Sequence, residues 1–361
     1  MINIGSPPAA ITSVGSAFPD ASYTQAEVGA LLGLDNRVAR RLLAAPHIRT
    51  RRLFLPPADP VTGRAPEESP AELHAKFRRG ALEIGGRAIA NALKTAALTP
   101  SDVGFLLCVT STGFLVPGLS SLFSRELGFR PDLVRADLVG MGCNAGLNGL
   151  NPLAQWVRHH PEKVAVLVCC EINSAMYVRD GTARTGIVNS LFGDGAAAAV
   201  ITAESAGGPY VLDFESHCLP DRWDAMRFDW DENAGKWSFF LDRDIPYVIG
   251  SNLVVPVTRL LERHGLRPES ISHWVLHTGG GAVIDSARQS LGLSEHDVRH
   301  TRSVLRDFGN ISSGSFLVSL ERLLDEGSAR PGEHGVMITM GPGAQIETAL
   351  IEFGAPRKGS R

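Results

Sequence analysis

The chain has 361 residues, of which 44% are hydrophobic, and its formal net charge is −3. This length is sufficient for two domains or one large fold. No basic run indicates nucleic-acid binding, and no stretch approaches the roughly 18 consecutive apolar residues of a membrane span. Because residues 1–18 also lack the positive n-region of a secretory signal, we expect a cytoplasmic enzyme.

The helix and strand signals alternate along the chain, which indicates an α/β fold. Residues 24–27 (TQAE) form a capping box that opens a first helix. Residues 69–72 (SPAE) combine an N-cap serine with Pro at the first helical position, and they open a long helix that ends before Thr99-Pro100. Short continuous apolar runs predict buried strands at 104–110, 164–170 and 274–277.

The two parts of the chain repeat a loose pattern. GFLLCVTSTG (104–113) and HWVLHTGGG (273–281) each combine an apolar strand, a Thr and a Gly turn, and FGDGAAAAVITA (192–203) and MGPGAQIETALI (340–351) each combine a Gly turn with a strand. This pattern predicts a duplicated α/β unit. We place the halves at residues 1–205 and 206–361.

The five cysteines do not form a pattern typical of disulfides or of zinc ligands, because they are odd in number and lack CxxC spacing. Cys143 differs from the others in its position. It lies in DLVGMGCNAG (137–146), where an apolar run ends in a Gly-flanked turn and a helix-like stretch begins. The unpaired N–H groups and positive dipole end of a helix N-terminus favour a thiolate. Cys143 is therefore our candidate nucleophile for acyl transfer.

A nucleophilic cysteine requires a base and a hydrogen-bonding partner. His277 ends a predicted strand and precedes a Gly-rich turn, and Asn310 lies in a Gly/Ser turn that opens a helix. Imidazole can hold the thiol as a thiolate, and His and Asn together can donate to a thioester oxygen. If the thioester is malonyl, such donors stabilise the enolate left by loss of carbon dioxide. Each residue taken alone has an ordinary structural explanation, since most buried His, Asn and Cys serve packing or turns.

The motifs GCNAG, HTGGG, GNISSGS and MGPGAQIE resemble those of type III polyketide synthases, and the resemblance covers nearly the whole chain, from about Ile11 to Phe353. The resemblance implies a thiolase fold, with duplicated α/β halves in a five-layered αβαβα arrangement, and a homodimer. It also implies a Cys143–His277–Asn310 triad that condenses malonyl-CoA. CoA then enters as part of the substrate, and no metal or separate cofactor is expected. Thr278 stands where many members of this family have Pro.

The resemblance also assigns residues to the substrate site by position. Phe192 and Phe239 match two gatekeeper phenylalanines between the CoA tunnel and the cavity, and Arg41 lies where members have basic residues at the tunnel mouth. Val116 matches a residue that members insert into the partner's cavity. The matching cavity-lining positions are Ser111, Thr112, Asn173, Met176 and Ile311.

The segments 111–122, 140–151, 224–250 and 306–316 are similar to those of bacterial members that supply a building block of glycopeptide antibiotics. This similarity predicts that four malonyl units give 3,5-dihydroxyphenylacetyl-CoA, with auxiliary enzymes that assist dehydration and aromatisation. Three alternatives stay open. They are a malonyl-primed relative with a tetrahydroxynaphthalene, resorcinol acid or pyrone product, a single-condensation enzyme of the ketoacyl synthase III or hydroxymethylglutaryl-CoA synthase type, and a catalytically silent thiolase-fold subunit.

Overall fold

The computed structural model describes residues 8–203 and 208–354, so the expected boundary between residues 205 and 206 lies outside it. Within the described residues, nine strands follow one another side by side in a mixed sheet. Their order is β11 (Ile271–Leu276), β12 (His334–Gly341), β13 (Gln345–Phe353), β8 (Pro209–Cys218), β1 (Ala9–Ala17), β7 (Gly195–Thr202), β6 (Val164–Glu171), β4 (Val103–Thr110) and β5 (Val134–Val139).

The strand pairing confirms the predicted duplication. In the first half β4 runs parallel to β6, which pairs antiparallel with β7, and β7 pairs antiparallel with β1. The second half repeats this pattern with β11, β12, β13 and β8. The halves meet at β1 and β8, which pair at Ala9–Val211 and Ala10–Tyr210 among the described residues.

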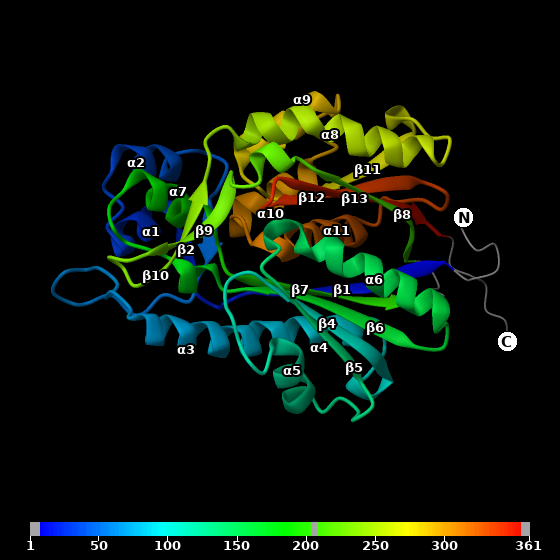
Figure 1. Ribbon diagram of the computed structural model, residues 1–361, viewed down its shortest axis with the longest axis horizontal. Coiled ribbons are helices and arrows are strands. Elements are labelled where there is room, and N and C mark those ends of the chain that lie inside the picture. The colour runs from blue at the N-terminus through cyan, green and yellow to red at the C-terminus, as the bar shows by residue number, and fades with distance from the viewer. Residues whose placement is uncertain (1–7, 204–207, 355–361) are drawn as a thin grey trace.

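Five layers are visible in Figure 1. Helices α8 (Ile245–Glu262) and α9 (Gly281–Ser290) cover one outer face, and α3 (Pro70–Gly80), α4 (Gly86–Thr95) and α5 (Leu119–Leu127) cover the other. Helices α6 (Ala145–His159) and α11 (Ser315–Glu326) lie between the two halves of the sheet. Their apolar side chains pack with those of both halves in one buried cluster, so the middle layer is the core that joins the halves.

The predicted helix starts are confirmed. Thr24 caps α1 (Gln25–Leu32) and Ser69 caps α3, each with the reciprocal hydrogen bonds of a capping box. A π-helical turn at Ala81–Gly85 joins α3 to α4, which gives the long helix expected before Thr99. None of the helices among the described residues has the length and apolarity needed to cross a membrane.

Smaller elements surround the ends of the inner helices. The hairpin of β9 (Met226–Asp231) and β10 (Lys236–Leu241) lies beside α7 (Ala183–Leu191), as Figure 1 shows. The remaining elements are α2 (Arg37–Leu43), α10 (Arg299–Phe308), β2 (Ser22–Thr24) and β3 (Thr50–Arg52). Short 3₁₀ turns precede both inner helices, at residues 142–144 and 312–314, and these turns position the candidate site.

Candidate active site

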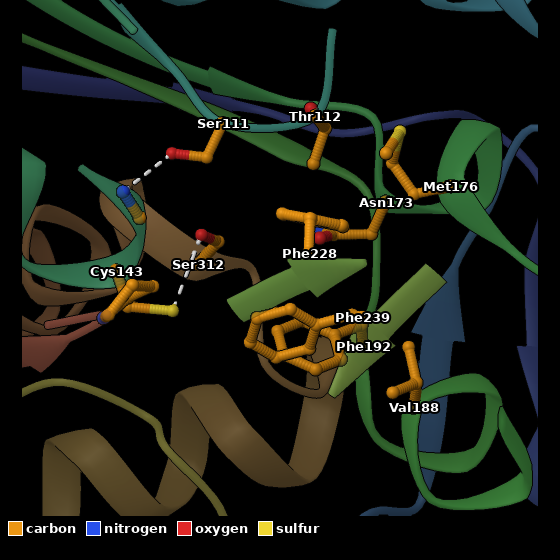
Figure 2. A pocket seen from close by; sticks show the side chains of 12 residues that line it. Ser111, Thr112, Cys143, Asn173, Met176, Val188, Phe192, Phe228, Phe239 and Ser312 are labelled. Carbon is orange, nitrogen blue, oxygen red and sulfur yellow. Dashed lines mark hydrogen bonds between the residues drawn. The ribbon is translucent and has the colours of Figure 1, made fainter. Parts of the chain in front are cut away.

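Cys143 lies in the 3₁₀ turn of residues 142–144, which we call the nucleophile turn, directly before α6. The turn follows β5, so the predicted strand-to-helix corner is confirmed. Gly142 has φ 74°, a left-handed conformation that glycine adopts without strain. Its N–H donates to Ser111 Oγ at 2.8 Å, and this bond fixes the start of the turn, as Figure 2 shows.

Burial raises the pKa of the Cys143 thiol to about 12, although its hydrogen bond with Ser312 acts in the opposite direction. Burial likewise lowers the pKa of the His277 imidazole to about 3. Desolvation disfavours the charged form of both groups, so the resting site holds a neutral thiol and a neutral imidazole. The effect of the helix terminus, from which we expected a thiolate, is outweighed by burial.

The segment of residues 310–315 connects the three predicted catalytic residues. Ser312 Oγ lies 3.4 Å from Cys143 Sγ (Figure 2), and Ser315 Oγ lies 2.6 Å from Nδ1 of His277. The amide Oδ1 of Asn310 accepts from the Ser312 N–H at 2.8 Å, which leaves Nδ2 as the donor that the Asn310 amide can present to a substrate. The described residues show no hydrogen bond between Cys143 and His277 themselves, so Ser312 and Ser315 mediate the arrangement.

Thr278 has a role here that proline could not fill. Its backbone N–H donates to Ser315 Oγ at 3.2 Å, and its hydroxyl is 3.5 Å from the Gly309 carbonyl. Proline has no N–H to donate. This chain therefore anchors Ser315, and through it His277, by a contact that a proline at position 278 would remove.

A cavity of about 420 Å³, its open mouth included, lies in front of Cys143. Six of the nine residues expected in the substrate site line it together with the nucleophile, and Figure 2 shows their side chains gathered around it. The complete lining is Ser111, Thr112, Gly142, Cys143, Asn173, Met176, Val188, Phe192, Phe228, Phe239, Ser312 and Pro342. Four of these lining residues were not expected from the sequence, namely Val188, Phe228, Ser312 and Pro342.

Aromatic rings form one wall of the cavity. Phe192 and Phe239 meet edge to face with ring centroids 5.7 Å apart, and Phe228 lies 4.9 Å from Phe239. Phe228 and Phe239 are directly opposed across the β9–β10 hairpin, so their side chains share a face. The turn signal of residues 232–235 and the alternation of β9 could have identified Phe228, since cross-strand partners follow from the register.

The buried carboxyl of Glu171 connects three segments of the site. It accepts from the Ser111 N–H and the Thr112 hydroxyl, both at 2.9 Å, and from the Ser313 hydroxyl at 2.5 Å. Burial raises its pKa, and these three donors oppose that shift. Glu171 thus holds the end of β6, the loop after β4 and the turn before α11 together.

Arg51 secures the segment that carries Phe192. It is fully buried, and its Nη1 donates to the carbonyls of Asn189 and Phe192 at 2.7 and 2.8 Å and to the Tyr177 hydroxyl at 3.1 Å. That hydroxyl in turn donates to the Phe192 carbonyl at 2.6 Å. Because Asn310 N–H donates to the neighbouring Leu191 carbonyl, the same segment supports both Phe192 and Asn310.

Tyr177→Phe should lower the free energy of unfolding by about 1–2 kcal/mol, because the Phe192 carbonyl loses a buried donor and Arg51 loses an acceptor. Urea denaturation of the purified protein measures this difference. Tyr247→Phe is the matched control, since Tyr247 is 77% exposed, and it should change stability by less than about 0.5 kcal/mol. Equal stabilities of the Tyr177→Phe variant and the parent would contradict this account.

Three expected substrate-site residues do not line the cavity. Ile311 is fully buried and packs in the core between the halves, with a methyl near Gly195. Arg41 lies on the exposed side of α2. Val116 is 82% exposed, on the loop between β4 and α5.

Residues 64–264 match the family described as FAE1/type III polyketide synthase-like protein, and residues 218–353 match the C-terminal domain of chalcone and stilbene synthases. The 3,5-dihydroxyphenylacetyl-CoA synthase of Amycolatopsis balhimycina is 52% identical over 342 residues, which cover 94% of this chain and 92% of the relative. The enzyme of the same name from Streptomyces toyocaensis is 51% identical over 350 residues, 95% of this chain and 90% of the relative.

A more distant relative, the 1,3,6,8-tetrahydroxynaphthalene synthase of Streptomyces peucetius subsp. caesius, is 31% identical over 355 residues, 95% of this chain and 93% of the relative. Among solved structures, the 1,3,6,8-tetrahydroxynaphthalene synthase of Streptomyces coelicolor A3(2), a bacterial type III polyketide synthase, superposes with a TM-score of 0.88 at 26% identity. The match covers 96% of this chain and 99% of that one. The thiolase fold expected from the sequence is therefore confirmed.

Proposed function

Because this chain belongs to the family of type III polyketide synthases, we propose that it condenses four malonyl-CoA molecules into 3,5-dihydroxyphenylacetyl-CoA. The observation that supports this product best is the identity to synthases of that name, 51–52% over more than nine-tenths of the chain. The identity to a tetrahydroxynaphthalene synthase is only 31%.

The reaction begins with transfer of malonyl from CoA to Cys143. The thiol sulfur attacks the thioester carbonyl, its proton passes to His277, and CoA leaves as the thiol. Isolation from water disfavours the charged form of each group, so it raises the pKa of Cys143 and lowers the pKa of His277. The same isolation strengthens the attraction between the thiolate and the imidazolium once the proton has been transferred. His277 thereby serves as the base for Cys143.

Chain extension requires a carbanion. A second malonyl thioester enters the cavity, and its carbonyl oxygen receives hydrogen bonds from Nδ2 of Asn310 and from His277. Loss of carbon dioxide leaves an enolate that these donors stabilise, and its carbon attacks the acyl group on Cys143. Four units give an eight-carbon chain, four carbon dioxide molecules and three free CoA, and ring closure with loss of water gives the aromatic product.

Proton transfer from Cys143 to His277 predicts a distinctive pH profile for alkylation of Cys143. In the parent enzyme the neutral imidazole accepts the thiol proton as the sulfur attacks, so the rate constant with iodoacetamide should vary little between about pH 6 and 8. In His277→Ala the thiol keeps its raised pKa without a partner, so the rate constant should rise about tenfold with each pH unit. Peptide mapping of alkylated Cys143 gives the rates, and parallel steep profiles in both proteins would exclude His277 as the base.

We propose that the protein acts as a homodimer in which Val116 reaches the partner's cavity, and that Arg41 contacts CoA. The supporting observation is that large apolar side chains are exposed on the loop before α5, at Phe114 and Val116, and on the edge strand β5, at Val134 and Val139. Such surfaces mark interaction sites. Sedimentation velocity should give twice the monomer mass of 38.6 kDa, and a monomer at micromolar concentration would contradict the proposal.

The proposed product is tested by incubation of the purified protein with malonyl-CoA as the sole acyl-CoA. Mass spectrometry before and after base hydrolysis should detect 3,5-dihydroxyphenylacetyl-CoA and then the free acid. Detection of a tetrahydroxynaphthalene, a pyrone or a resorcinol acid would be consistent with a type III polyketide synthase but would show that the proposed product is wrong. A single-condensation product would refute iterative extension.

A further inference from the structure

The closing motif at residues 340–347 (MGPGAQIE) packs against the nucleophile turn from the other half of the fold. A Cβ added to Gly142 would lie 2.3 Å from Cδ of Pro342, and a Cβ added to Gly341 would lie 2.1 Å from Oδ1 of Asn144. Glycine at both positions therefore permits backbone contact closer than any other residue allows. The Thr339 hydroxyl adds a hydrogen bond to the Asn144 carbonyl at 3.4 Å.

A chain of side-chain hydrogen bonds extends from this contact into α6 and back to β13. Asn144 Nδ2 donates to Asn148 Oδ1 at 2.7 Å, and Asn148 Nδ2 donates to Glu347 Oε1 at 2.8 Å. Glu347 also accepts from Gln345 Nε2 at 2.8 Å and from the Ser216 hydroxyl. Asn144 is fully buried and Glu347 is 4% exposed, so the chain lies largely out of water.

The carboxylate sets the direction of this chain. An ionised carboxyl only accepts hydrogen bonds, so Asn148 must turn its NH₂ group toward Glu347 and its carbonyl toward Asn144. Asn144 must then turn its NH₂ group toward Asn148. The other end of the Asn144 amide, its Oδ1, is buried and accepts no hydrogen bond from the described residues. The orientation of this amide is therefore set by the bonds that lead from its NH₂ group to Glu347.

We propose that Glu347 is a positioning residue for Cys143, which it orients through Asn148 and Asn144. Glu347 belongs to the sheet of the second half, whereas the nucleophile turn belongs to the first. The hydrogen-bond chain therefore fixes the position of Cys143 relative to the half that carries His277 and Asn310. This role rests on the proposed polyketide synthase function, in which acyl transfer depends on the placement of the sulfur.

The proposal is tested by exchanging the amide of Asn148 and the carboxylate of Glu347 between their two positions. Glu347→Gln can both donate and accept, which allows the amide chain to reverse, and Asn148→Asp sets one carboxylate against another. Combined, N148D and E347Q restore one carboxylate, which accepts from Asn144 on one side and from the new amide at position 347 on the other. Glu352→Gln is the matched control, because Glu352 lies on the same strand in a surface pair with His334 at 3.7 Å.

For each folded variant, the alkylation rate constant of Cys143 with iodoacetamide and the kcat and KM for malonyl-CoA are measured. Each single variant should lose about tenfold in alkylation rate and kcat at unchanged KM, because a small displacement of a reacting atom costs one to two powers of ten. The double variant should return to within about threefold of the parent, and Glu352→Gln should match the parent. If Asn148→Asp does not fold, the double variant must still have a higher alkylation rate constant and a higher kcat than Glu347→Gln.

A double variant slower than Glu347→Gln, or single variants with the rate constants of the parent, would overturn the role of Glu347. Loss of stability without loss of alkylation rate would also overturn it, because the contacts would then be structural only. A parent protein that forms no polyketide but shows the same alkylation pattern would support the role of Glu347 and refute the proposed function.

Discussion

We expect Cys143→Ala to reduce polyketide formation by about 10⁴-fold or more, the scale of loss when a catalytic nucleophile is removed. Among the described residues, Cys143 is the cysteine that lines the cavity. The alternatives Cys108, Cys169 and Cys170 are fully buried, and burial raises their pKa values. None of them can replace the missing acyl carrier.

The same variant should continue to convert malonyl-CoA to acetyl-CoA, because decarboxylation uses the donors of His277 and Asn310 and not the sulfur. Liquid chromatography of CoA esters separates the two activities. Cys218→Ser, at an exposed position, is the control and should retain full synthesis. Polyketide formation at the parent rate by Cys143→Ala would remove this residue from the mechanism.

Asn310→Ala should slow malonyl decarboxylation by about 10²–10³-fold, because it removes a donor aimed at the enolate oxygen. Loading of malonyl onto Cys143 should persist. The fold should also persist, since the backbone of Asn310 keeps its bonds to Leu191 and Gly193. Decarboxylation is followed by release of labelled carbon dioxide, and loading by the mass of the intact protein.

Asn310→Asp distinguishes the two roles of this side chain, which are donation to the substrate from Nδ2 and acceptance of the Ser312 N–H by Oδ1. Aspartate retains an oxygen for the N–H of Ser312, a residue with φ 54° that depends on the local turn, but it offers no N–H to substrate. We therefore expect Asn310→Asp to be at least as slow as Asn310→Ala. Decarboxylation near the parent rate in Asn310→Asp would show that the amide shapes the turn and donates nothing to the enolate.

Much of the fold follows from local signals in the sequence. The capping boxes at residues 24–27 and 69–72, the apolar strands and the corner that holds Cys143 depend on residues close in sequence, and all were predicted. The duplication was readable because both halves repeat the same strand and Gly-turn order. The placement of Phe239 followed from the family resemblance, and Phe228 would have followed from the hairpin register.

The remaining features depend on contacts between distant residues. Neither the buried carboxyl of Glu171 nor the anchoring role of Arg51 has a local signature, because the partners described above lie between 59 and 142 residues away in the sequence. Ile311 was expected in the cavity, but its place before the left-handed Ser312 turns it into the core between the halves. The expectation of a resting thiolate at Cys143 was wrong, because the sequence shows the start of the helix but not the burial that raises the pKa of the thiol.

The most direct test of the proposed function is a starter-unit experiment with fully ¹³C-labelled malonyl-CoA and an excess of unlabelled acetyl-CoA. If malonyl-CoA is both starter and extender, the 3,5-dihydroxyphenylacetyl product should carry label at all eight carbons, whatever the excess of acetyl-CoA. A product that retains two unlabelled carbons would show priming by acetyl-CoA. That result, or the absence of any dihydroxyphenylacetyl species, would contradict the proposal.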